Sequence, residues 1–424
     1  MDPADLTATA ALARLRAGTL SAPALMEACL ARIAAREGEV RAMAFLDPQL
    51  AMRNAREAAG RAGGRLGGVP VGVKDVLDTA DMPTACNSPI WRGHHPRADA
   101  AAVAWTRAEG GAVLGKTVTT EFATRKPGPT TNPHDAGRTP GGSSSGSAAG
   151  VAAGFFPVAF GTQTAGSVIR PAAFCGVVGY KPSFGLISRV GMKLMADSLD
   201  TVGVIARGVA DCALLAGAAS GRDLGDPERR PARAPRIGVC RSPAWEHALP
   251  ETRALLQDGG DRLARAGAAV ADLDLPHAFA LLAPAHPVVM HAESAQSLGW
   301  EMLRHREALS AGLREQMEWG LAQPLEAVDA ARAAFADARQ AFPAVTAGYD
   351  VLVTPAAPGE APAGLEWTGD PAFNAVWTGL HVPCVTVPAG EGPGGMPLGL
   401  QVVGRVGEDR ETLAWAGWIA AALG

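Results

Sequence analysis

The sequence predicts a single large α/β domain with a mixed or mostly parallel sheet, and three observations point to it. Short apolar stretches typical of strands alternate along the chain with amphipathic stretches typical of helices. Of the 424 residues, 48% are apolar and only 19% are charged, so a large buried core is expected. No repeat or evident linker divides the chain. We therefore expect one domain over 1–424, with a helix-rich cap or insertion at 210–345.

The first half of the chain has clear element signals. Amphipathic patterns predict helices over 7–17, 22–36 and 48–61, and Ser21 is a suitable N-cap for the second. The apolar run "VPVGV" predicts a buried strand that ends near Lys74. A helix over 98–111 and a strand over 112–117 follow. Residues 124–142 are rich in Pro, Thr, Gly and Asn, which predicts a long irregular loop of the kind that often carries function.

The second half continues the alternation. We expect a helix at 144–154, a strand near 157–161, a tight turn at 162–167 and a short helix that begins at Ser167. Residues 236–240 and 268–276 read as strands separated by a helix at 250–266, and 288–346 reads as largely helical. The stretches "DVLVTP", "PCVTVPA" and "PLGLQVVGR" predict short strands, and a helix follows Asp409.

Composition and charge exclude several functional classes. The net charge of −4 gives no basic field that would favour nucleic acid or an anionic membrane. The first residues lack the pattern of a signal peptide, and no run reaches the ~18 apolar residues that a spanning helix requires. We expect a cytoplasmic protein without metal or cofactor. Reduced, buried thiols are expected at the six cysteines, which form no C-x-x-C pair: Cys29, Cys86, Cys175, Cys212, Cys240 and Cys384.

Residues 140–150, "PGGSSSGSAAG", raise the question of function. Gly/Ser tracts are typical of flexible linkers, but this one runs directly into the apolar stretch "VAAGFFPVAFG". Two local patterns fail on context. Residues 110–117 match a phosphate-binding loop, yet the predicted strand lies inside the motif rather than before it. "GSSSG" around Ser144 matches a nucleophile elbow, yet no strand leads into it and no histidine lies in a recognisable partner motif.

A lysine can replace histidine as the base in serine catalysis. Lys74 ends an apolar strand, where burial could lower its pKa from ~10.4 toward neutrality. Ser167 lies in a turn between a strand and a helix, so free backbone N–H groups of Thr164, Ala165, Gly166 and Ser167 could form an oxyanion hole. Two simpler interpretations stay open: Lys74 as a solvated strand-end lysine, and Ser167 as an N-cap.

Taken together, "VGVKD", "GGSSSGSAAGVAAG" and "GTQTAGSVIRPAAFCG" resemble the amidase signature family in order and spacing. Similar segments run through nearly the whole chain, including "GKTVTTEFA", "VLVTPAAP" and "MPLGLQVVGR". The resemblance implies a twisted mixed sheet with helices on both faces and a catalytic core at 65–210. It also implies that Lys74 is the general base, Ser143 a bridging serine after a cis peptide bond, and Ser167 the nucleophile that forms an acyl-enzyme.

Within that family, the pattern "SVIRPAA" and the sequence "TQT" resemble bacterial malonamidase. In that enzyme the residue that matches Arg170 holds a substrate carboxylate, so we expect a small acidic amide as substrate. The alternative is that Arg170 braces the fold. Two departures bear on specificity: Ala165 replaces a glycine common in the family, and Arg125 with Lys126 makes the long loop more basic, although a solvated Arg125 is the simpler interpretation.

The expected function is therefore an amidohydrolase that cleaves the C–N bond of a small, carboxylate-bearing amide and releases ammonia or an amine. Two alternatives remain: the glutaminase component of a tRNA-dependent amidotransferase, which would require partner subunits, and a non-catalytic binding protein on the same fold. The resemblance also suggests a homodimer.

Overall fold

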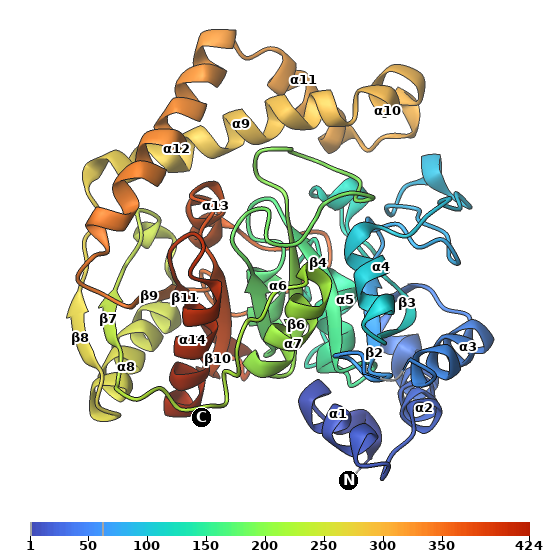
Figure 1. Ribbon diagram of the computed structural model, residues 1–424. Helices are drawn as coiled ribbons and strands as arrows, with labels where there is room; N and C mark the ends of the chain where they lie inside the picture. Colours follow the sequence, from blue (N-terminus) through green and yellow to red (C-terminus); the bar gives the residue numbers. More distant parts are fainter. Residues whose placement is uncertain (1, 62) are drawn as a thin grey trace.

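The computed structural model describes residues 2–61 and 63–424 as one α/β molecule built on a central sheet (Figure 1). This confirms the predicted fold class. The strands are β1 Met43–Phe45, β2 Pro70–Lys74, β3 Ala112–Thr117, β4 Val158–Gln163, β5 Val178–Lys181, β6 Thr201–Ala206, β7 Arg236–Val239, β8 Ala269–Asp272, β9 Val351–Pro355, β10 Cys384–Glu391 and β11 Pro397–Val403.

Helices surround this sheet. They are α1 Ala8–Arg16, α2 Ala22–Val40, α3 Pro48–Ala59, α4 Ala101–Ala108, α5 Ser145–Ala152, α6 Ile169–Phe174, α7 Val209–Ser220, α8 Pro250–Arg265, α9 Leu282–Ser297, α10 Gly299–Arg304, α11 Ala311–Leu321, α12 Leu325–Val345, α13 Ala372–Gly379 and α14 Asp409–Leu423. None of the helices in the described ranges is both long enough and apolar enough to cross a membrane.

The sheet has 11 strands in the order β1-β3-β2-β4-β6-β5-β10-β11-β9-β7-β8. Its pairing is mixed: β2 runs parallel to both β3 and β4, whereas β6 and β10 pair antiparallel with their neighbours. The parallel group matters for function, because the carboxyl ends of β2, β3 and β4 meet at one edge of the sheet. Loops at such an edge commonly carry ligand sites.

Alternating side chains of the strands bury both faces of the sheet. Val71, Val73 and Phe160 belong to a core cluster that includes residues of α4, α7 and α14, whereas Ala159 and Ile205 belong to a cluster that includes residues of α2, α3 and α5. Because side chains alternate along a strand, each apolar stretch supplies both layers. Helices therefore cover both faces, as the family resemblance implied.

A helical layer covers one edge of the sheet (Figure 1). The labels α9 to α12 lie along the edge of the molecule opposite the two chain termini. We call residues 277–345 the cap; its helices α9 and α12 share an apolar cluster with α6 and α13. The segment 210–345, expected to be one cap or insertion, therefore has two parts. Its first part contains β7, α8 and β8, which belong to the main sheet and its helices, and its second part is the cap.

Candidate active site

Lys74 ends β2 and is fully buried. Its Nζ lies 2.7 Å from Ser143 Oγ, 2.7 Å from Thr162 Oγ1 and 3.3 Å from the Thr162 carbonyl oxygen. None of these hydrogen-bond partners is a carboxylate. Burial lowers the pKa of Lys74 from 10.5 to about 7, and the charge of Asp200 opposes this shift. The solvated alternative for Lys74 is therefore wrong, and its amine is close to the point of half-protonation at neutral pH.

Ser143 follows a cis peptide bond between Gly142 and Ser143, as the family resemblance implied. The bond lies in the irregular chain before α5, and the side chain of Ser143 is almost completely buried. Arg170 Nη2 donates to the Gly142 carbonyl at 2.8 Å, and the Thr120 N–H donates to the Ser143 carbonyl at 3.3 Å. These contacts hold the Ser143 hydroxyl against Lys74.

Ser167 lies in the turn between β4 and α6, next to this pair. Its carbonyl accepts a hydrogen bond from the Ser144 N–H at 3.2 Å, so residues 143 and 144 run beside the turn. The side chain of Ser167 is 8% exposed and lines a cavity of about 220 Å³. Within the described ranges the Ser167 hydroxyl forms no hydrogen bond, and this includes the hydroxyl of Ser143. The Ser167 proton is therefore not committed to another acceptor.

The expectation that α6 begins at Ser167 is wrong by two residues. The helix begins at Ile169, and Gln163 Oε1 accepts hydrogen bonds from the Val168 and Ile169 N–H groups at 2.9 and 3.0 Å. A side chain from the end of β4 therefore caps the helix in place of Ser167. The N-cap alternative for Ser167 is contradicted, and residues 164–167 form a turn before the helix.

The backbone of this turn is compatible with the oxyanion hole predicted at residues 164–167. Within the described ranges, the N–H groups of Ala165, Gly166 and Ser167 donate no hydrogen bond, so they are available to a ligand. A Cβ at Gly166 would lie 2.4 Å from Asn374 Oδ1, a contact that only glycine avoids. Thr164, the residue after β4, is fixed through its side chain, since its hydroxyl donates to Asp200 Oδ1 at 2.5 Å.

Arg170 is buried, and its contacts bear on both of the roles considered for it. Nε donates to the Thr368 carbonyl at 2.8 Å and Nη2 to the Gly142 carbonyl, so the side chain braces two loops. Nη1 has no hydrogen-bond partner within the described ranges, although the residue lines the cavity. Burial lowers the pKa of Arg170 to about 10, so the guanidinium stays charged at neutral pH.

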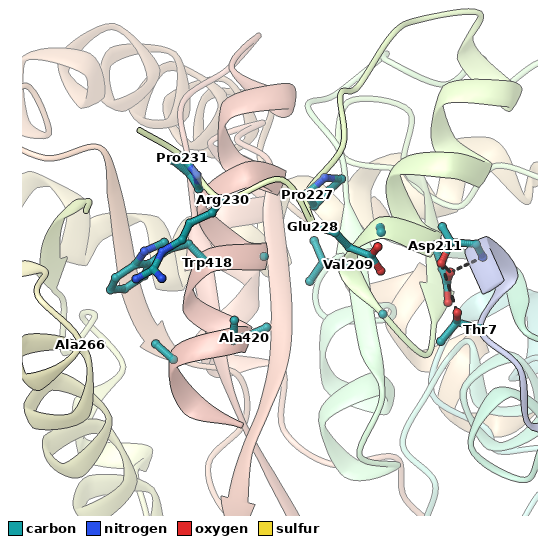
Figure 2. Close-up of a pocket in the computed structure, with 16 residues that line it drawn as sticks. Thr7, Val209, Asp211, Pro227, Glu228, Arg230, Pro231, Ala266, Trp418 and Ala420 are labelled. Atoms are coloured by element: carbon teal, nitrogen blue, oxygen red, sulfur yellow. Dashed lines mark hydrogen bonds between the residues drawn. The ribbon is translucent and has the colours of Figure 1, made fainter. Parts of the chain in front are cut away.

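The cavity has walls from the main body and from the cap. The main body contributes Ser167, Arg170 and loop residues 367–371, while α9 contributes Met290, His291 and Ser294 and α11 contributes Gln316. Arg125 lies at the exposed rim. A second cavity, of about 600 Å³, lies between the start of α7, residues 227–231 and α14 (Figure 2). Its labelled residues, among them Asp211 and Trp418, include none of the predicted catalytic groups, so its greater volume does not make it the reaction site.

Two further residues can now be compared with the sequence analysis: Ser144, which it rejected as a nucleophile, and Thr162, which it did not single out. Ser144 is fully buried and exchanges hydrogen bonds with the Thr162 backbone, and no strand precedes it, so it is not a nucleophile elbow. Thr162 was missed. Its contact with Lys74 depends on β4 lying parallel to β2, which no local sequence pattern shows.

Comparison with known proteins decides the family. The Amidase family model matches residues 24–413. The chain belongs to the amidase family. This amidase is a hydrolase on an α/β fold whose candidate site lies at the carboxyl ends of parallel strands, as the architecture described above requires.

Curated relatives of this amidase include amidotransferase subunits. The chain is 34% identical to a glutamyl-tRNA(Gln) amidotransferase subunit of Chloroflexus aggregans, over 94% of this chain and 93% of that protein. It is 36% identical to the corresponding subunit of Anaeromyxobacter sp., over 93% and 91%.

Solved structures similar to the amidase include proteins named as amidases. A crystal structure of an amidase superposes with a TM-score of 0.90 at 31% identity, covering 99% of this chain and 100% of that one. The peptide amidase of Stenotrophomonas maltophilia gives 0.82 at 30% identity, covering 99% and 97%. A protein solved in work on a vestigial protein complex and an s-triazine catabolic enzyme gives 0.89 at 28% identity, covering 99% of each chain.

Proposed function

We propose that this chain hydrolyses the C–N bond of a small amide through an acyl-enzyme on Ser167, with Ser143 and Lys74 as the proton relay. The observation that carries the proposal is the environment of Lys74. It is buried, its Nζ forms hydrogen bonds only with hydroxyl and carbonyl oxygens among the described residues, and its pKa falls to about 7. A neutral amine is a good base, and a lysine in water at neutral pH would not be one.

The three contacts of Lys74 Nζ suit this role. A neutral amine has two N–H groups and one lone pair. The N–H groups can donate to the two Thr162 oxygens, at 2.7 and 3.3 Å, and the lone pair is then left for the hydroxyl of Ser143 at 2.7 Å. Thr162 thereby acts as a positioning residue that turns the basic electron pair toward the relay.

The reaction follows from this arrangement. Ser167 Oγ attacks the amide carbon while its proton passes to Ser143 Oγ, and the Ser143 proton passes to Lys74 Nζ. The N–H groups of residues 165–167 stabilise the tetrahedral oxyanion. The C–N bond then breaks, and the leaving nitrogen takes the proton back through Ser143. Water attacks the acyl-enzyme with the same relay and releases the acid.

Arg170 supports a preference for amides that carry a carboxylate, as in malonamidase. Its charged Nη1 has no partner among the described residues, and it lies close to Gly166 in the turn that follows β4. A carboxylate one or two carbons from the scissile amide would satisfy it. Because Nη2 also holds the Gly142 carbonyl, Arg170→Met should lower turnover of every amide and raise KM selectively for acidic ones. Equal changes in KM for acidic and neutral amides would contradict the carboxylate role.

The alternative function is that of the glutaminase component of an amidotransferase. Its support is the similarity to amidotransferase subunits over more than nine tenths of both chains. A tagged chain purified gently from its source cells would then retain partner proteins. Glutamine hydrolysis that is present in this preparation and lost when the partners are removed in high salt would favour this function over an independent amidase.

An ammonia-release screen tests the main proposal. The isolated chain is incubated with malonamate, small neutral amides, aryl amides, ureas and glutamine. We expect turnover of at least one small amide, its loss in Ser167→Ala and its retention in Ser188→Ala, an exposed serine outside the cavity. A fluorophosphonate probe should label the wild type and not Ser167→Ala. No turnover and no labelling would favour a non-catalytic binding protein.

A further inference from the structure

Each carbonyl group of the turn at 164–166 is held by a donor from a different part of the molecule. His286 Nε2 bonds the Thr164 carbonyl at 2.9 Å, and Thr378 Oγ1 donates to the Ala165 carbonyl at 2.6 Å. The Arg170 N–H, in α6, donates to the Gly166 carbonyl at 3.0 Å. The turn is therefore anchored through its oxygens, while its N–H groups stay unoccupied.

Peptide geometry links these anchors to the reaction. A peptide unit is planar and, when trans, its C=O and N–H point in opposite directions. A donor that fixes the carbonyl of one residue therefore also fixes the direction of the next residue's N–H. By this relation His286 aims the N–H of Ala165 and Thr378 aims the N–H of Gly166.

We propose that His286 is a positioning residue that orients the oxyanion hole from the cap, with Thr378 as its counterpart from α13. The inference rests on the proposed function, since it assigns a role to the turn beside Ser167. His286 comes from α9, and Thr164 is the first residue of the turn after β4. The cap is thus a part of the catalytic geometry and not only a cover over the cavity.

The surroundings of His286 suit a fixed neutral donor. The side chain is 3% exposed and packs edge-on against Phe335 of α12, with ring centres 6.4 Å apart. Burial lowers the pKa of His286 to about 4, so the ring is neutral at the pH where Lys74 is a base. A neutral ring that donates from Nε2 has its proton on that atom. On the other side of Thr164, Asp200 holds the hydroxyl, so this residue is clamped from both the cap and the main body.

Removal of the His286 donor should act on the transition state more than on substrate binding. Loss of one oxyanion-hole donor typically costs ~10²–10³-fold in kcat. His286→Phe leaves the Ala165 N–H in place but releases the Thr164 carbonyl of the same peptide unit. We therefore expect a loss of about 10–100-fold in kcat with KM changed less than about threefold. His286→Gln, whose amide can donate to the same carbonyl, should recover most of the rate.

The experiment compares His286→Phe, His286→Gln and Thr378→Val with wild type and with His277→Phe, a matched change at an exposed histidine of the cap. The substrate is the best amide from the ammonia-release screen. Each variant is measured for kcat, KM, thermal unfolding and affinity for propylboronic acid, which forms a tetrahedral adduct with a serine nucleophile. We expect the affinity for the boronic acid to fall by the same factor as kcat/KM, because both report the oxyanion hole.

The inference would be overturned if His286→Phe kept the kcat and the boronic acid affinity of the wild type. It would also be overturned if the variant changed only KM. If His286→Phe fails to fold, His286→Gln and Thr378→Val carry the test: unchanged kcat in Thr378→Val together with a large loss in His286→Gln would contradict it. A different result would reject the proposed function itself. A folded wild type that turns over no amide and is not labelled at Ser167 would reject that function, and this inference with it.

Discussion

Lys74 shows how much a single side chain can be predicted from its context. Its place at the end of an apolar strand left burial and solvation both open, and the family resemblance supplied its pairing with Ser143. In the structure Lys74 is buried and lies 2.7 Å from Ser143. The role of Thr162 was not predictable, because it depends on β4 lying parallel to β2. Contacts between neighbouring strands arise from pairing that no local pattern specifies.

The buried lysine predicts a pH-dependent difference in stability. Its pKa is about 7 in the folded protein, against 10.5 when the amine is solvated. The unfolded chain therefore binds the proton more tightly than the folded protein does. As a result, the free energy of unfolding increases as pH rises from about 7 toward 10. Lys74→Met removes this linkage. We expect the stability of the wild type relative to Lys74→Met to increase over that range, as measured by urea unfolding at fixed salt.

Below pH 7 both states of the wild type carry the proton, so the difference between the two proteins should be constant. A difference that is independent of pH between 7 and 10 would show that the lysine is not buried as the structure describes. A solvated lysine such as Lys126, replaced by Met, is the control and should show no such trend.

At the scale of elements, the segment from β4 through the turn to α6 was predicted with the correct types of element but with the wrong start of the helix. The strand, the turn and the helix all exist, but the helix begins at Ile169 because the side chain of Gln163 caps it. A sequence pattern favours serine as a cap, and only the folded turn shows a glutamine in that place. The strands β1, β5 and β6 were also missed, although turn residues such as Gly176 and Pro182 flank β5.

The same segment predicts the effect of one methyl group. A Cβ at Gly166 would lie 2.4 Å from Asn374 Oδ1 and 3.0 Å from Arg170 Nη1, so either these buried side chains or the turn must move to admit it. We expect Gly166→Ala to lower kcat/KM by about 10²–10³-fold, the cost of a lost oxyanion donor. Gly38→Ala is the matched control, because a Cβ at this position in α2 meets nothing within 4 Å. Equal activity in the two variants would contradict the role of the turn.

At the scale of the whole molecule, the cap and the sheet form one structure. The sequence predicted a helix-rich insertion, but not that β7 and β8 would extend the main sheet, since strand order depends on distant pairing. Glu301 of α10 links the two parts. This buried carboxylate accepts from Trp91 Nε1 at 2.9 Å and pairs with Lys193 at 2.5 Å.

Removing that link should destabilise the molecule measurably. Glu301→Ala leaves the indole N–H and the ammonium of Lys193 without their partner, which we expect to cost about 1–3 kcal/mol in the free energy of unfolding. The control is Glu307→Ala, an exposed cap residue whose ion pairs are solvated and whose loss should cost less than about 1 kcal/mol. Urea unfolding measures both. Equal losses would show that Glu301 does not hold the cap to the main body.

The most direct test of the account is the rate at which a fluorophosphonate modifies Ser167 as a function of pH, because it requires no knowledge of the substrate. If neutral Lys74 activates Ser167 through Ser143, the rate should rise with a single ionisation near pH 7 and should fall by at least about 10²-fold in Lys74→Met. A rate that does not change between pH 5 and 9, or equal labelling of the Met variant, would contradict the relay.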